Sequence, residues 1–274
     1  MQAFKQHKKI VLAAVLLAAA LIVSLFVVQY LSRPALTHMP SPTPTTTPTT
    51  TPTTTSTTTT PSTSSTPTQM PPPTPTPAPL LQPGEITQYN GTQLTSVQDF
   101  INELLLHPDV SINGPQSIDP STYELSVTGM VNNSLQLSYA DVVNNFTSHL
   151  QVETLLCVEG WQVTMLWQGT LLSDILQQAG TSPNATTLIF YASDGYSTAL
   201  PIDYIMQNNI MIAYKMNNVT LTAQTGWPFF LVASNQYGYK WIMWITSIDV
   251  SDNSGYLGYW ESQGYPNNAT VTGG

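Results

Sequence analysis

Apolar residues recur at helical spacing in three parts of the region 80–274. In residues 97–105 these apolar positions follow Ser96, and Ser96 with Asp99 has the pattern of a helix start. The segment predicts a helix that begins near Ser96 and ends before Pro108. Ser138 opens a second short pattern of this kind. The stretch TLLSDILQQAG (170–180) predicts a third helix, with Gly180 as its C-terminal cap.

Other segments have the pattern of strands. Residues 123–129 alternate between apolar and polar side chains, as a half-buried strand does. Four further runs are rich in apolar and β-branched residues and are separated by turn residues, at 187–192, 210–216, 229–233 and 241–250. Strands outnumber helices and show no regular βαβ alternation, so the predicted fold class is α+β, mixed and mostly β.

The N-terminal part has a different character. Residues 10–31 carry no charge and are long enough to cross a bilayer as a helix. Lys5, Lys8 and Lys9 precede this run, which predicts that residues 1–9 are cytoplasmic and that the rest of the chain lies outside the cell membrane. We interpret the run as an uncleaved transmembrane signal anchor; a cleaved signal peptide is the alternative.

Residues 39–79 consist almost entirely of Thr, Pro and Ser. Such a segment has nothing to bury and favours extended polyproline II conformations, so we expect a disordered, O-glycosylated stalk. The remaining region, 80–274, is long enough for one globular domain.

The charge of region 80–274 and its glycosylation sequons limit the classes of function that the domain can have. Region 80–274 contains fifteen acidic residues and only two basic ones, Lys215 and Lys240, so acids exceed bases by 13. Nucleic acid is a poor partner for such a domain. Six Asn-x-Ser/Thr sequons fit a glycosylated, extracellular surface. A single cysteine excludes an internal disulfide.

Cys157 is the residue with the most distinctive chemistry. One cysteine excludes the CxxC and CxxCH motifs, the four histidines stand too far apart for HExxH, and no phosphate-binding glycine loop occurs. Cys157 follows a strand-like segment and precedes a turn at Gly160, where a thiol can face a soft metal. The alternative is a small buried core side chain. Glu159 is expected to face solvent or to cap the turn.

Several segments, in order, carry a family resemblance. They are IDPSTYELSVTGMV, CVEGW with WQGTLLSDIL, LIFYASDGYSTALPIDYI, TGWPFFLVASNQYGYKWIMWITSIDVSD and GYLGYWESQGYPNNA. Together they resemble the molybdopterin-binding domain of the sulfite oxidase family, in particular its single-domain branches. The resemblance covers most of residues 112–270.

The resemblance implies a set of roles. Cys157 would give its thiolate to molybdenum as the catalytic metal ligand, and a pterin dithiolene would give two more sulfurs. Trp161 and Trp167 would form walls of the metal pocket, or would be plain core aromatics. The other residues implied to contact the cofactor are Ser193, Asp194, Gly195, Tyr239 and Lys240, although Asp194 and Gly195 could simply form a tight turn.

Two departures from the family pattern concern anions. Phe230 and Met243 stand where several branches have Arg and Lys, which leaves Lys240 as the main candidate for the pterin phosphate and Lys215 as a weaker one. With no arginine in the domain, an oxyanion substrate is not expected. A small neutral molecule, such as a sulfoxide or N-oxide, is admitted more easily.

The sequence therefore supports two hypotheses. The first is a membrane-anchored, extracytoplasmic molybdenum-molybdopterin oxidoreductase that performs oxygen-atom or two-electron transfer on a small molecule. Because the chain has no haem motif, such an enzyme needs a separate electron-transfer partner. The second is a cell-surface binding or structural glycoprotein that keeps the fold without the cofactor.

Overall fold

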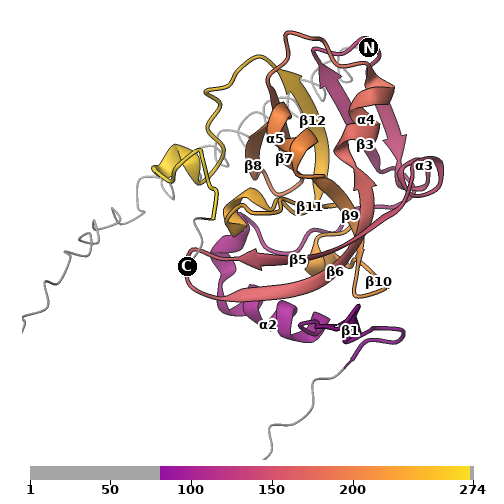
Figure 1. Cartoon of the computed structure of the whole chain (residues 1–274), viewed down its shortest axis with the longest axis vertical. Helices are drawn as coiled ribbons and strands as arrows, with labels where there is room; N and C mark the ends of the chain where they lie inside the picture. Colours follow the sequence, from indigo (N-terminus) through magenta and orange to yellow (C-terminus); the bar gives the residue numbers. More distant parts are fainter. Residues whose placement is uncertain (1–80, 272–274) are drawn as a thin grey trace, which may run out of the picture. The chain divides into compact units, whose positions relative to one another are not determined.

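Two five-stranded β-sheets form the frame of the domain (Figure 1). The computed structural model describes residues 81–271. The first sheet has the order β10-β9-β6-β5, with β11 also paired to β9. Its strands are β5 (His149–Leu156), β6 (Gln162–Leu171), β9 (Met211–Met216), β10 (Val219–Thr220) and β11 (Phe230–Val232).

The second sheet has the order β4-β3-β12-β7-β8. Its strands are β3 (Glu124–Gly129), β4 (Leu135–Ser138), β7 (Thr187–Ala192), β8 (Ser197–Pro201) and β12 (Ile245–Ser251). All pairs in both sheets are antiparallel except β12 with β3, which is parallel. A small separate hairpin joins β1 (Gln88–Tyr89) to β2 (Thr92–Gln93).

The helices are few and short. They are α2 (Val97–Leu106), α3 (Tyr139–Asn145), α4 (Leu172–Ala179) and α5 (Ile202–Gln207), with 3-10 turns η1 (Pro108–Val110), η2 (Ala223–Thr225), η3 (Gly238–Lys240) and η4 (Glu261–Gln263). The predicted α+β, mostly-β fold class is confirmed for the described residues.

The predicted helix ends are confirmed by their caps. The Ser96 side chain accepts the backbone N–H of Asp99 at the start of α2, and Ser138 forms a capping box with Asp141 at the start of α3. Gly180 closes α4 in the left-handed conformation, with φ of 69°. The third helix is two residues shorter at its start than predicted, because residues 170 and 171 belong to β6.

One strand prediction was wrong in its first half. Residues 241–244 are apolar, but β12 begins only at Ile245. Trp244 has a φ of 52°, and its indole N–H donates to the carbonyl of Ala223. The side chains of 241–244 are all buried. The segment is therefore apolar because it fills the core as a coil, and burial alone does not distinguish such a coil from a strand.

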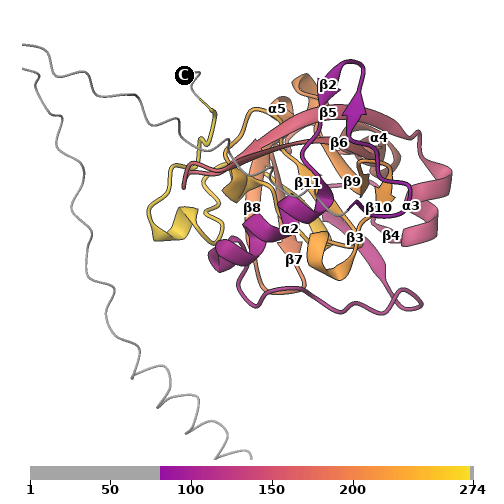
Figure 2. The same ribbon diagram turned by 90° about the horizontal axis from the view of Figure 1, so that it is seen from below.

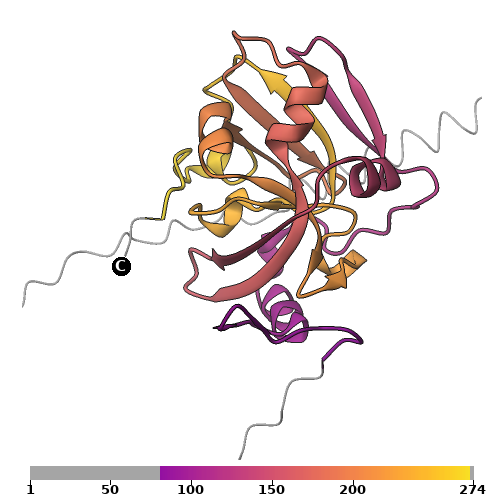
Figure 3. The same cartoon turned by 45° about the vertical axis from the view of Figure 1, so that its right-hand side comes forward.

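The β5–β6 hairpin brings the predicted cysteine segment to the edge of the first sheet. Eight residue pairs hold β5 against β6, from His149 with Gly169 to Leu156 with Gln162. Figure 3 shows this hairpin as a long two-stranded ribbon with α2 beneath it. Trp167 on β6 is fully buried and packs against the rings of Phe100 and Phe230. These contacts fix α2 to the hairpin.

The predicted transmembrane segment (10–31) and stalk (39–79) lie outside the described residues. Within 81–271, none of the helices combines the length and apolar character that a membrane span requires.

A substitution at Gly169 tests how closely β6 approaches its neighbouring strand β9. A Cβ at this position would lie 2.2 Å from the carbonyl oxygen of Ile212 and 2.7 Å from Cα of Ala213. We expect Gly169→Ala to lower the free energy of unfolding by about 2 kcal/mol in urea titrations, because the strands must separate. Gly255→Ala, which meets no atom closer than 3.7 Å, should change it by less than about 0.5 kcal/mol. Equal effects of the two changes would contradict this packing.

Candidate functional site

Cys157 opens a tight turn at the end of the β5–β6 hairpin. Its backbone N–H donates to the carbonyl of Trp161 at 2.9 Å, and the N–H of Gly160 donates back to the Cys157 carbonyl at 3.1 Å. Gly160 has a φ of 96°, a value that side-chain-bearing residues rarely adopt. The turn predicted at Gly160 is thus present and holds Cys157 at the end of β5.

A second predicted segment runs directly beside this turn. Tyr237 forms an isolated parallel bridge with Leu156, the last residue of β5. A Cβ on Gly238 would lie 3.6 Å from Cα of Cys157, so the two backbones approach closely. The Tyr-Gly-Tyr-Lys segment and the cysteine segment are eighty residues apart in the sequence and adjacent in the fold.

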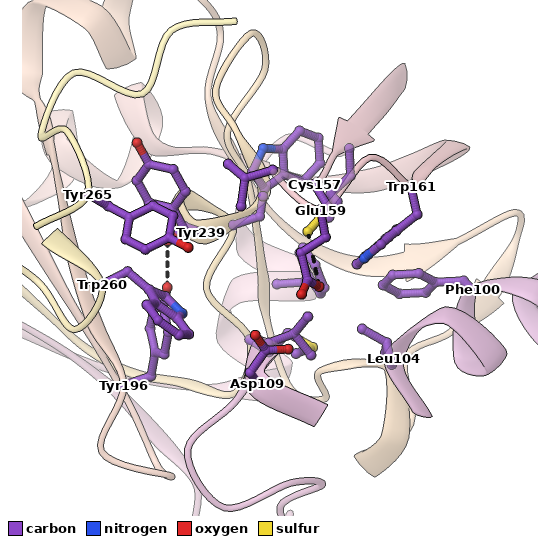
Figure 4. Close-up of a pocket in the computed structure, with 17 residues that line it drawn as sticks. Phe100, Leu104, Asp109, Cys157, Glu159, Trp161, Tyr196, Tyr239, Trp260 and Tyr265 are labelled. Atoms are coloured by element: carbon purple, nitrogen blue, oxygen red, sulfur yellow. Dashed lines mark hydrogen bonds between the residues drawn. The ribbon is translucent and has the colours of Figure 1, made fainter. Parts of the chain in front are cut away.

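The Asp-Gly-Tyr segment joins the same site through Tyr196. Gly195, with a φ of 90°, forms the turn between β7 and β8. The hydroxyl of Tyr196 donates to the carbonyl of Tyr239 at 2.7 Å (Figure 4). Three motifs from separate parts of the sequence therefore meet at one place.

These segments line an open pocket with about 590 Å³ of empty space, part of it open to solvent. Figure 4 shows Cys157, Glu159 and Trp161 on one side and Tyr239, Trp260 and Tyr265 on the other. Figure 2 shows the C-terminal segment that contains η4 in yellow at one side of the domain, and Trp260 and Tyr265 of this segment line the pocket. The remaining wall is largely apolar and comes from Phe100, Leu104, Val110, Leu155, Phe230, Trp241 and Met243.

The Cys157 thiol is half-buried and sits in a negative field. Burial is the largest cause that raises its pKa, and the carboxylates of Glu159 and Asp109 raise it further. Backbone N–H groups of Glu159 and Val158 act in the opposite direction but do not cancel these effects. The thiol is consequently held in its protonated form at neutral pH until a stronger partner displaces the proton.

Glu159 does more than face solvent or cap the turn. Its Oε2 atom lies 2.7 Å from Nδ1 of His107 and 4.0 Å from Sγ of Cys157. The His107 ring stacks on Trp161 with centroids 5.6 Å apart. His107 therefore links the end of α2 to the cysteine turn, and the pocket mouth is fixed from two elements.

Lys240 is enclosed by the protein itself. Its ammonium donates to Oε1 of Glu261, to the carbonyl of Ala199 and to Oδ1 of Asn267, and its side chain is completely buried. Burial lowers its pKa, while the Glu261 carboxylate opposes that shift. An ammonium has three N–H donors, and all three are used here. To bind a phosphate, Lys240 would have to exchange one of these acceptors.

The structure separates the other implied site residues into two groups. Trp161 and Tyr239 line the pocket, while Trp167 lies in the core and does not wall it. Ser193 is exposed and is not among the residues that line the pocket. The Asp194 carboxylate accepts the backbone N–H groups of Ile112 and Tyr196, which gives it a structural use in the turn.

Sequence reasoning missed part of the pocket wall. Asp109 follows α2, and Trp260 and Tyr265 come from the C-terminal segment. No pattern in the sequence connects these residues with Cys157, because their proximity depends on how the sheets pack. The one available signal was the GYLGYWESQGYPNNA segment, which carries three aromatic side chains within seven residues, at positions 259, 260 and 265.

The donor set fits the metal end of a molybdopterin cofactor. A thiol is a suitable soft ligand for molybdenum, and Nε1 of Trp161 is a buried donor without a hydrogen-bond partner that points into the pocket (Figure 4). The residues that line the pocket do not fit the phosphate end of the cofactor equally well. Among the described residues that line the pocket there is no lysine or arginine.

The Lys240–Glu261 pair gives a stability prediction. Lys240→Met leaves a buried carboxylate without its cation, and we expect the free energy of unfolding to fall by about 3–5 kcal/mol in urea titrations. The double variant with Glu261→Gln should recover part of this loss. Lys215→Met, at a half-buried lysine with no ion pair among the described residues, should cost about 1 kcal/mol or less. A Lys240→Met protein as stable as Lys215→Met would contradict the buried pair.

Comparison with known proteins identifies relatives of the region that contains the site. YuiH of Bacillus subtilis, an uncharacterized oxidoreductase, is 31% identical over 152 residues, which are 55% of this chain and 76% of YuiH. The protein-methionine-sulfoxide reductase catalytic subunit MsrP of Gluconobacter oxydans is 26% identical over 155 residues, half of each chain. Rat mitochondrial sulfite oxidase is 28% identical over 179 residues, 54% of this chain and 32% of that enzyme.

The family model described as the oxidoreductase molybdopterin binding domain matches residues 112–260. The matched range includes Cys157, the Asp-Gly-Tyr turn and the Tyr-Gly-Tyr-Lys segment, whose proximity forms the pocket. The chain therefore belongs to the oxidoreductase molybdopterin-binding domain family, the family of sulfite oxidase.

Proposed function

We propose that this protein is a molybdopterin-dependent oxidoreductase in which Cys157 is the protein's ligand to molybdenum. One observation carries the proposal: the only cysteine of the chain lines the open pocket and lies in the region that the family model matches. The cofactor supplies oxygen-atom or two-electron transfer when it is bound.

The chain's own residues have three roles in this proposal. Cys157 holds the metal through its thiolate, and Trp161 offers an unpaired N–H to an acceptor on the bound group. The aromatic wall excludes water, which strengthens every polar contact inside the pocket. Glu159 is fixed by His107, so the turn that carries Cys157 keeps its shape when the pocket is filled.

The charge of the pocket limits the substrate. Asp109 and Glu159 line it, and no lysine or arginine does among the described residues. Sulfite and nitrate are anions and would meet repulsion from both carboxylates without a compensating cation. The proposed substrate is therefore a small molecule that is not an anion.

Location and electron supply are part of the proposal. The uncharged run at 10–31, preceded by three lysines, and the six sequons support a single-pass anchor with the domain outside the cytoplasm. MsrP carries the name of a catalytic subunit, which supports a separate electron-transfer partner for this chain as well.

A second candidate function is a surface binding module without the cofactor. The enclosed state of Lys240 favours it, because the residue expected to hold the pterin phosphate has all its donors engaged. In that case the pocket would bind another small molecule, and Cys157 would be an ordinary half-buried thiol.

Molybdenum content distinguishes these functions. Full-length protein from a host that makes the cofactor should contain about one molybdenum per chain by elemental mass spectrometry, since one thiol holds one metal. Cys157→Ser should lose most of it. Val158→Ala, a truncation in the same turn at a residue that offers no ligand atom, should keep it. Metal retained by Cys157→Ser would refute the ligand assignment, and folded wild-type protein without molybdenum would favour the binding module.

The thiol of metal-free protein gives an independent check. Because burial and two carboxylates raise the pKa of Cys157, the thiolate fraction at neutral pH is reduced. We expect iodoacetamide to label folded protein more slowly than urea-unfolded protein at pH 7, with the rate rising only at higher pH. Asp109→Asn removes one of the carboxylates and should shift that rise to lower pH. Faster labelling of the folded protein would show that the carboxylates do not act on the thiol.

A further inference from the structure

One side of the pocket has the geometry of an aromatic box. Tyr265 meets Tyr239 edge-on with centroids 5.3 Å apart and an interplanar angle of 64°. It meets Trp260 in the same manner, at 5.2 Å and 62°. Figure 4 shows the three rings grouped opposite Cys157. Rings that stand at such angles present their electron-rich faces from several directions.

The second feature is negative charge at the mouth. Asp109 is exposed and has no hydrogen-bond or ion-pair partner among the described residues for its carboxylate. Glu159 is shared with His107, the one neighbouring side chain that can become a cation. Figure 4 shows both acids among the side chains that line the pocket with Cys157. A positive charge that enters here would be stabilised chiefly by the Asp109 carboxylate, because Glu159 is already engaged by His107.

The two features together select a type of ligand. Aromatic faces attract a cation that can touch them, and they have no lone pairs for a hard metal ion. The apolar wall from Leu104, Leu155 and Met243 favours alkyl groups on that cation. An anion would meet the carboxylates, and a neutral molecule would leave them unused.

We propose that the pocket beside Cys157 binds a small organic cation, with alkyl groups against the rings of Tyr239, Trp260 and Tyr265 and positive charge facing Asp109. The proposal rests on the proposed function in that it names the substrate class of the same site. It changes the expectation from a neutral molecule to a cationic one, because the sequence did not show that Asp109 and the aromatic rings line one pocket.

Choline tests the charge requirement at constant shape. Its uncharged counterpart 3,3-dimethylbutan-1-ol has a carbon in place of the ammonium nitrogen. We expect calorimetric titration of the full-length protein to show choline binding at least about tenfold more tightly than the alcohol. Equal affinity for the two molecules, or binding of neither, would overturn the proposal.

Variants separate this pocket from the general acidity of the domain. Asp109→Asn removes the negative charge and should weaken choline binding about threefold or more. The effect is modest because solvent partly screens this carboxylate. Trp260→Leu should weaken it about fivefold through loss of one aromatic face. Glu124→Gln is the matched control, an exposed acid on β3 that does not line the pocket, and it should leave binding unchanged. An equal effect of Glu124→Gln and Asp109→Asn would show that only net charge matters.

The titration is made with both molybdenum-free and molybdenum-loaded protein. Choline bound by the loaded protein, and bound more weakly by loaded Asp109→Asn, supports the assignment as substrate class. Choline bound only by metal-free protein would place it in the cofactor's space and overturn that assignment. If no preparation contains molybdenum but Asp109-dependent binding persists, the proposed function fails while the cation site stands. If the protein contains molybdenum but does not bind choline, the proposed function stands while the cation site fails.

Discussion

The buried pair of Lys240 and Glu261 is the contact on which the pocket depends. A charge without water must be matched by a counter-charge and by hydrogen-bond acceptors, and Lys240 finds these on β8, on η4 and at Asn267. The result is that the C-terminal segment is held against the second sheet. Trp260 and Tyr265 lie on either side of this connection, so one ion pair places two walls of the pocket.

The remaining walls follow from backbone contacts. The Leu156–Tyr237 bridge brings the cysteine turn to η3, and the Tyr196 hydroxyl fixes the β7–β8 turn to the carbonyl of Tyr239. His107 then attaches the end of α2 to Glu159. Each of these contacts is modest in energy, but together they bring five separate segments of the chain around one sulfur atom. The site is thus a product of tertiary packing more than of any single motif.

Much of the frame could be predicted from the sequence, since caps and periodicity are local. Ser96, Ser138 and Gly180 mark helix ends because their own backbone neighbours need partners, whatever the rest of the fold does. The family and the pocket position of Cys157 also followed from the ordered segments. The pairing of Lys240 with Glu261 could not be predicted, nor could the placement of Asp109, Trp260 and Tyr265 around one pocket. These arrangements join residues that no spacing rule relates, and the coil at 241–244 shows the same limit for strands.

The position of Trp260, Tyr265 and Asn267 in the sequence has a consequence for biosynthesis. The first sheet and the cysteine turn use residues up to 232, which can pair while the ribosome is still translating the rest. The pocket cannot close until residue 267 has emerged, because Lys240 lacks two of its acceptors before then. Any molecule that fills this pocket therefore enters only after residue 267 has left the ribosome, so its capture follows the pairing of the first sheet.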